Sequence, residues 1–155
     1  MINVINRAKI LVVDDDPDIV QALTMILESL DYRVVGARNG LEALDRIESE
    51  KPDLMILDLL MPKMDGFAVY QILQNRHRSG FWNMPTIILT SVREEASRRR
   101  FEMETGRKLD ADEYMEKPFL PADLLAKVGN LIARKRSPIS WDSPGDKGGA
   151  HGKET

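Results

Sequence analysis

The fold is first visible in the stretch Ile10-Leu11-Val12-Val13-Asp14-Asp15-Asp16-Pro17. Its first four residues form an uninterrupted apolar run, which is typical of a strand buried on both faces of a parallel sheet. Its last two residues are a helix start signal, because Asp is a good N-cap and Pro is favoured at the first helical position. For Asp16, capping is a better prediction than metal binding. The stretch therefore predicts a buried strand that leads into a helix, with the acidic pair Asp14 and Asp15 at the junction.

The same alternation of a short apolar run and a stretch of helical periodicity recurs along the chain. Strands are predicted at residues 10–13, 32–37, 54–57, 86–89 and 113–116. Helices are predicted at residues 17–30, 40–48, from 67 onward, 93–104 and 121–135. Five β/α units in succession predict an α/β fold with a doubly wound parallel sheet of five strands and five helices. Residues 1–136 would form this domain. Residues 137–155, rich in Pro, Gly, Ser and charge, are expected to be a disordered tail.

The composition narrows the possible classes of function. The 155 residues are 43% hydrophobic and 30% charged, as in ordinary globular proteins. A net charge of −3 gives no sign of a general nucleic-acid or membrane surface. Cysteine is absent, which excludes disulfides and thiolate chemistry. No apolar run approaches the roughly 18 residues that cross a bilayer. We therefore expect a cytoplasmic protein without direct nucleic-acid or membrane contacts.

Chemically capable side chains follow four of the predicted strands. Asp14 and Asp15 follow the first, Asp58 the third, Thr90 the fourth and Lys117 the fifth. The carboxyl ends of parallel strands share one edge of a sheet, where ligands bind in open α/β folds. We therefore expect these five side chains to converge.

The convergence of three carboxylates predicts a cation site. Asp14, Asp15 and Asp58 would repel one another unless a cation neutralised them, and ligands that are all oxygen suit Mg²⁺. A carboxylate such as Asp58 can attack phosphorus as a nucleophile. Phosphoryl transfer then needs mainly positioning and charge neutralisation, which Lys117 and the hydroxyl of Thr90 would add to the metal.

These segments resemble the response-regulator receiver domain, the CheY-like phosphoacceptor module of two-component signalling. The resemblance covers roughly residues 7–136 and implies a flavodoxin-like sheet with strand order 2-1-3-4-5. It rests on five segments in order, which are Ile10-Leu11-Val12-Val13-Asp14-Asp15-Asp16-Pro17, Pro52-Asp53-Leu54-Met55-Ile56-Leu57-Asp58, Met61-Pro62-Lys63-Met64-Asp65-Gly66, Ile88-Leu89-Thr90-Ser91 and Tyr114-Met115-Glu116-Lys117-Pro118-Phe119.

The resemblance assigns a role to each site residue. It implies that Asp58 is the phosphorylation site and a metal ligand, that Asp15 binds Mg²⁺ directly, and that Asp14 binds it through water. The backbone carbonyl of Leu60 would complete the protein's ligands. Thr90 and Lys117 would contact the phosphoryl group, and Tyr114 would be an aromatic switch residue that turns inward when Thr90 moves toward the phosphate. The Lys117-Pro118 bond is expected to be cis.

By the same resemblance, the chain is a single-domain response regulator that is phosphorylated by a sensor histidine kinase or a histidine phosphotransfer protein. Phosphorylation would switch its conformation and control an unknown protein partner, with the chain as a monomer or a phosphorylation-dependent dimer. It would assist its own phosphorylation and dephosphorylation without being an enzyme for an external substrate. A phosphate sink or phosphorelay shuttle is the alternative. An aspartyl-nucleophile phosphatase of the haloacid dehalogenase type is disfavoured, since such enzymes have a second Asp where this chain has Leu60.

The chain departs from the family pattern in two ways. The segment between Thr90 and Lys117 is longer than usual, with the surplus around residues 104–110, and residues 75–84 are slightly long. We hypothesise that this face is remodelled for a particular partner. Leu60 and Val92 are apolar at positions that flank the attacking water, which predicts a phospho-Asp58 that lasts minutes or longer. The arginines at 98–100 and the basic residues at 134–136 are interpreted as solvated helix faces.

Overall fold

The computed structural model describes residues 7–61, 63–78, 84–108 and 111–136, so the predicted tail at 137–155 lies outside the described residues. Five parallel strands form one sheet in the order β2-β1-β3-β4-β5, which confirms the flavodoxin-like receiver fold. The strands are β1 (Lys9–Val13), β2 (Arg33–Ala37), β3 (Leu54–Asp58), β4 (Thr86–Thr90) and β5 (Glu113–Glu116). The helices are α1 (Pro17–Glu28), α2 (Gly40–Glu50), α3 (Gly66–Arg78), α4 (Val92–Thr105) and α5 (Pro121–Arg136).

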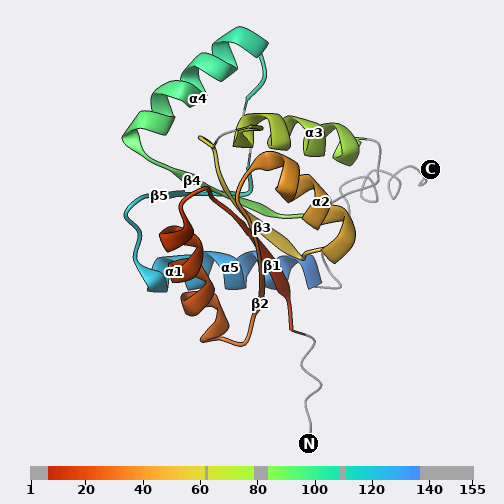
Figure 1. The fold of residues 1–155 in the computed structure, drawn as a ribbon, viewed down its shortest axis with the longest axis vertical. Coiled ribbons are helices and arrows are strands. Elements are labelled where there is room, and N and C mark those ends of the chain that lie inside the picture. Colours follow the sequence, from red (N-terminus) through yellow and green to blue (C-terminus); the bar gives the residue numbers. More distant parts are fainter. Residues whose placement is uncertain (1–6, 62, 79–83, 109–110, 137–155) are drawn as a thin grey trace, which may run out of the picture.

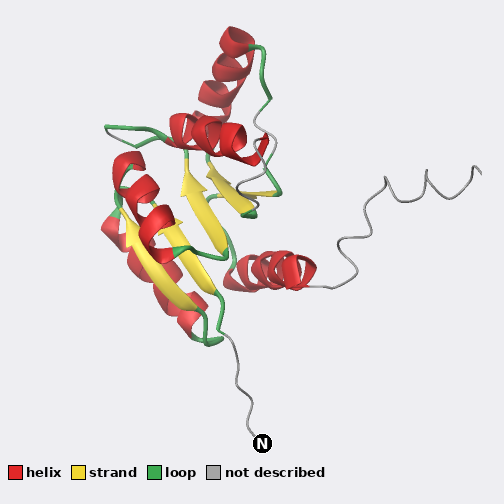
Figure 2. Ribbon diagram, turned by 90° about the vertical axis from the view of Figure 1, so that its right-hand side faces the viewer, coloured by secondary structure: helices red, strands yellow, loops and turns green. Residues whose placement is uncertain are grey.

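The sheet lies between two layers of helices (Figures 1 and 2), and a hydrophobic core fills each of its two faces. Successive strand residues point to opposite faces, so each buried strand contributes to both cores. On one face, Leu11, Met55 and Ile88 pack with side chains of α2 and α3. On the other, residues of the same strands, such as Val12 and Ile56, pack with α1 and α5. This burial on both faces is why the strands are continuous apolar runs.

The predicted element boundaries agree with the structure to within a few residues. The largest differences are two residues each: α1 was predicted to continue through Leu30 but ends at Glu28, and α2 was predicted to end at residue 48 but ends at Glu50. Leu30 is 54% exposed. Leu30 continues the apolar spacing of α1, but this periodicity does not indicate at which residue the chain leaves the helix. Within the described residues, no helix combines the length and the apolar character needed to cross a membrane.

Helix α4 differs from the other four helices because it lacks a continuous apolar face. It extends away from the sheet beside α3 (Figures 1 and 2). Phe101 of α4 stacks on Phe67 of α3, with ring centroids 4.8 Å apart. Met103, in the last turn of α4, is 85% exposed. Aromatic contacts thus hold α4 where an apolar stripe would hold an ordinary surface helix.

Candidate functional site

The parallel register brings the predicted site residues to one edge of the sheet. Asp58 is the last residue of β3 and pairs in register with Leu89, directly before Thr90 at the end of β4. Thr90 in turn pairs with Glu116, directly before Lys117. Asp14 follows the last residue of β1. The predicted convergence at the carboxyl edge is therefore correct.

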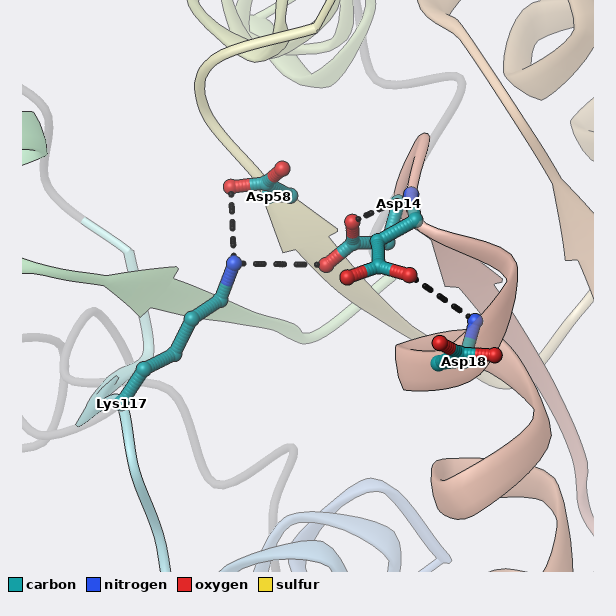
Figure 3. Close-up of polar contacts among 5 residues, drawn as sticks. Asp14, Asp18, Asp58 and Lys117 are labelled. Atoms are coloured by element: carbon teal, nitrogen blue, oxygen red, sulfur yellow. Dashed lines mark hydrogen bonds and ion pairs between the residues drawn. The ribbon is translucent and has the colours of Figure 1, made fainter.

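Asp14 is held by the turn that starts α1. The side chain is buried, and its Oδ1 accepts a hydrogen bond of 3.0 Å from the backbone N–H of Asp16. Its own N–H donates to the carbonyl of Ala37 at 3.1 Å, which joins this turn to the end of β2. Asp16 caps α1 by accepting from the N–H of Asp18 at 2.9 Å (Figure 3), so its predicted capping role is confirmed.

Lys117 connects the two buried carboxylates (Figure 3). Its Nζ lies 3.4 Å from Oδ2 of Asp14 and 3.4 Å from Oδ1 of Asp58. Its backbone N–H donates to the carbonyl of Thr90 at 2.8 Å, which ties the end of β5 to the end of β4. The Lys117-Pro118 bond is cis, as expected. One ammonium group therefore serves both buried acids of the site.

The electrostatics of the site are not fully balanced by this lysine. Burial raises the pKa of Asp14 to about 6 from an ordinary value of 3.8, and the nearby Asp58 carboxylate adds to the rise. The hydrogen bond from Asp16 and the charge of Lys117 oppose the rise without cancelling it. A second cation would stabilise the ionised site.

A metal ion fits this group of residues. Asp14, Asp15 and Asp58 each present a carboxylate oxygen, and these oxygens lie within 4.8 Å of one another. Asp14 and Asp58 are buried, whereas Asp15 is exposed, so a cation bound here keeps access to water and to a phosphate. An oxygen-only set of this kind suits Mg²⁺, which usually retains several waters. The predicted ligation by the backbone carbonyl of Leu60 stays a prediction, and the Leu60 side chain is half-buried against the core beneath α2 and α3.

Two glycines, the first residues of α2 and α3, also shape the site. Gly66 N–H donates to the carbonyl of Leu59 at 2.9 Å, and a Cβ at Gly66 would lie 2.3 Å from the carbonyl oxygen of Asp58. Gly40 N–H donates to the carbonyl of Met64 at 2.8 Å, and a Cβ there would lie 2.4 Å from that oxygen. The helix starts of α2 and α3 thus pack against the end of β3 and the loop that follows Asp58. Only the absence of a Cβ allows this approach.

Thr90 and Tyr114 lie on the neighbouring strands β4 and β5. Thr90 is buried at the site edge. Tyr114 is half-buried, and its hydroxyl accepts a hydrogen bond of 3.1 Å from the N–H of Ala111. The role of Tyr114 as a switch residue stays a prediction.

The arginines of α4 do not share one environment. Arg99 and Arg100 are exposed, as interpreted from the sequence. Arg98 is only half-exposed, and its guanidinium lies over the ring of Tyr114, 5.0 Å from the centroid. A run of three arginines gives no local signal for this difference, which depends on where β5 lies. Val92 begins α4, but its side chain is outside the described part, so its predicted place beside the attacking water is not tested.

Comparisons with known proteins agree on one family. The model of the response regulator receiver domain matches residues 10–129. The probable transcriptional regulator ycf27 of Cyanophora paradoxa is 40% identical over 134 residues, which cover 86% of this chain and 52% of that protein. The alkaline phosphatase synthesis transcriptional regulatory protein PhoP of Bacillus subtilis is 41% identical over 126 residues, which cover 81% of this chain and 49% of that protein. The chain thus spans about half the length of these curated relatives.

Solved structures give the same result. The signal receiver domain of a signal transduction histidine kinase from Syntrophus aciditrophicus has a TM-score of 0.69 and 33% identity, covering 84% of this chain and 94% of that one. A response regulator receiver domain protein from Clostridium thermocellum has a TM-score of 0.67 and 30% identity, covering 83% and 96%. With the acidic edge, its lysine and the strand order already established, this chain belongs to the response regulator receiver domain family.

Proposed function

We propose that this chain accepts a phosphoryl group on Asp58 from a phosphohistidine donor and changes conformation to control a protein partner. One observation supports this most: Lys117 Nζ lies 3.4 Å from a carboxylate oxygen of Asp14 and 3.4 Å from one of Asp58. The carboxylate of Asp15 lies at the same edge of the sheet. This arrangement combines a carboxylate nucleophile, a cation and a metal-binding group of acids. Receiver domains of response regulators interact with histidine kinases, so a kinase or a histidine phosphotransfer protein is the proposed donor.

The proposed transfer forms one bond and breaks one bond. An oxygen of Asp58 attacks phosphorus, the P–N bond to the donor histidine breaks, and its electron pair returns to the imidazole. Lys117 loses part of its interaction with the Asp58 carboxylate and instead neutralises the charge on the phosphoryl oxygens. The hydroxyl of Thr90 donates a hydrogen bond to a phosphoryl oxygen. Mg²⁺ held by Asp14, Asp15 and Asp58 would neutralise the charge that builds up on the phosphoryl group. The product is an acyl phosphate on the protein itself, so we propose no activity on an external metabolite.

The phosphoacceptor role can be tested with a small phosphodonor. Intact-protein mass spectrometry after incubation with phosphoramidate and Mg²⁺ should show one added phosphoryl group. Asp58→Asn should show none, and Asp18→Asn, which changes an exposed acid on α1, should behave as the parent protein does. Phosphorylation of Asp58→Asn at the parental rate would exclude this residue as the acceptor.

We further propose that the surplus residues after α4 form part of the partner surface. Gly106, Arg107 and Lys108 line a cavity of about 260 Å³ together with Tyr70 of α3 and Phe101 of α4. Arg107 and Lys108 are exposed, and neither forms an ion pair with the described residues. An aromatic wall beside two cations fits a partner segment that carries carboxylates next to an apolar side chain.

Shortening residues 105–109 should abolish binding of the partner while Asp58 is still phosphorylated. The double variant Arg107→Ser with Lys108→Ser is a milder test of the same surface, and Arg99→Ser with Arg100→Ser is its matched control on α4. Loss of phosphorylation in the shortened chain, or unchanged partner binding, would contradict this assignment. A phosphate sink or relay shuttle would instead pass the phosphoryl group on to a histidine protein without any such partner complex.

A further inference from the structure

Arg98 connects α4 to β5 through an aromatic ring instead of a hydrogen bond to that strand. Its Cζ lies 5.0 Å from the ring centroid of Tyr114, within the range of a cation–π interaction. Glu95 and Glu102, one turn away on either side, form ion pairs with it at 3.6 Å. Among the described residues, none accepts a hydrogen bond from its buried Nε–H. The guanidinium therefore depends on the ring and on these two carboxylates for its stabilisation.

The hydroxyl of Tyr114 is held on the side away from the phosphoacceptor site. It accepts a hydrogen bond from the N–H of Ala111, which precedes β5. The register places Tyr114 opposite Ile88, whereas Thr90 lies opposite Glu116, at the far end of the strand pair. Arg98 covers the ring and the Ala111 N–H holds the hydroxyl, so the ring is fixed at two points in this conformation.

The face of β5 that carries Tyr114 also borders an open volume beside Thr90. Residues two apart on a strand share a face, so Glu116 and Tyr114 project to the same side. Glu116, Thr90 and Glu95 line a cavity of about 420 Å³ at the foot of α4. Tyr114 does not line this cavity in the present conformation, and a ring turned toward it would leave the guanidinium of Arg98.

We propose that Arg98 is a positioning residue that holds Tyr114 away from Thr90 and thereby sets how readily the domain responds to phosphorylation. This inference rests on the proposed function of Asp58. Phosphorylation and the cation–π contact compete, because the contact stabilises only the conformer in which Tyr114 lies under Arg98. A ligand at Asp58 that favours the other conformer must overcome that stabilisation. A cation–π contact at a partly exposed site corresponds to roughly a two- to fivefold change in this equilibrium.

The test combines two measurements on the full chain. Beryllofluoride with Mg²⁺ serves as the probe at Asp58, and 3-fluorotyrosine incorporation gives fluorine NMR signals for only three tyrosines. Arg98→Gln should shift the Tyr114 signal before any beryllofluoride is added. It should also lower the beryllofluoride concentration for half-saturation by about two- to fivefold. The matched control is Arg100→Gln, an exposed arginine of the same helix, which should do neither.

The effect of Arg98 should depend on the ring of Tyr114, whereas a merely structural role would not require the ring. In a Tyr114→Ala background, Arg98→Gln should no longer change beryllofluoride affinity, because the ring it restrains is gone. Arg98→Lys keeps the positive charge and should restore part of the parental affinity. If Arg98→Gln behaves as Arg100→Gln does, or acts equally strongly without the ring, the inference is wrong while the phosphoacceptor function stands. If beryllofluoride fails to bind the parent protein, the proposed function is wrong and the inference falls with it.

Discussion

Lys117 places its ammonium group 3.4 Å from the carboxylate of Asp14, a residue 103 positions earlier in the chain. The same nitrogen lies 3.4 Å from Asp58, so the two acids compete for one cation. This sharing has opposite consequences for metal binding and for phosphoryl transfer. Lys117 competes with the metal for the carboxylates, but it stabilises the negative charge of the phosphoryl group.

Replacing Lys117 with Met should therefore have effects of opposite sign. Mg²⁺ should bind more tightly, since the acids lose their competing cation, and titration by isothermal calorimetry can measure this. Phosphorylation by phosphoramidate should slow by about tenfold or more, because charge neutralisation at the phosphoryl oxygens is lost. The control is Lys127→Met, which removes a lysine paired with Glu113 outside the site. Weaker Mg²⁺ binding in Lys117→Met would show that the lysine organises the acids instead of competing for them.

The raised pKa of Asp14 predicts how metal binding depends on pH. With a pKa of about 6, Asp14 holds a proton over a range in which an ordinary Asp is ionised. Mg²⁺ must displace that proton, so its apparent affinity should fall as the pH drops through about 6. Calorimetric titrations between pH 5 and 8 would measure this, with Asp14→Asn as the variant that should lose the dependence. A flat profile in the parent protein would contradict the assignment.

The same pKa predicts a stability effect in the absence of metal. The folded state binds the Asp14 proton more tightly than the unfolded chain, whose ordinary pKa is 3.8. This contribution is complete below pH 3.8 and is lost as the pH rises through about 6. At pH 7 without Mg²⁺, Asp14→Asn should therefore increase the free energy of unfolding, by something on the order of 1–3 kcal/mol. Urea denaturation at pH 7 and pH 4 would measure it, and the gain should shrink at the lower pH.

Gly66→Ala should disturb Asp58 directly. The new Cβ would lie 2.3 Å from the Asp58 carbonyl oxygen and 2.7 Å from Leu59 Cα, so the backbone must move. We expect a loss of about 1–3 kcal/mol in the free energy of unfolding together with slower phosphorylation. Gly129→Ala on α5 is the matched control, since its Cβ meets nothing within 4 Å. That change should stabilise the protein by up to roughly 1 kcal/mol, as expected in a helix interior.

Leu60→Asn should shorten the lifetime of phospho-Asp58. An amide at this position can orient the attacking water, which the apolar side chain cannot do, so decay of the acyl phosphate should speed up severalfold. Loss of the phosphorylated mass over time gives the rate. Leu41→Asn, which alters an exposed leucine of α2, should leave the rate unchanged. If phospho-Asp58 decays at the parental rate in both variants, the apolar side chain of Leu60 does not control its lifetime.

The amino-acid sequence by itself determined the β/α alternation, the parallel sheet and the identity of the acids at its edge. These features depend on local periodicity and on strand ends, and each can be seen in a window of about ten residues. The continuous apolar run at residues 10–13 and the Asp16-Pro17 start signal both appear in the structure where they were predicted. The end of α1 was placed too late because amphipathic spacing continues past the point where the chain turns.

Only the tertiary structure decided which side chains share a charge and which glycines are indispensable. The contact of Lys117 with Asp14 depends on the ends of strands from opposite parts of the chain, and the approach of Gly66 to Asp58 depends on how α3 packs. Arg98 differs from Arg99 and Arg100 for the same reason, since only its position on α4 faces the ring of Tyr114. The neighbours of a residue in the sequence specify whether it lies in a helix or a strand and where it falls in the periodic pattern of that element. Its protonation, its burial and its partner are set by residues that folding brings from elsewhere in the chain.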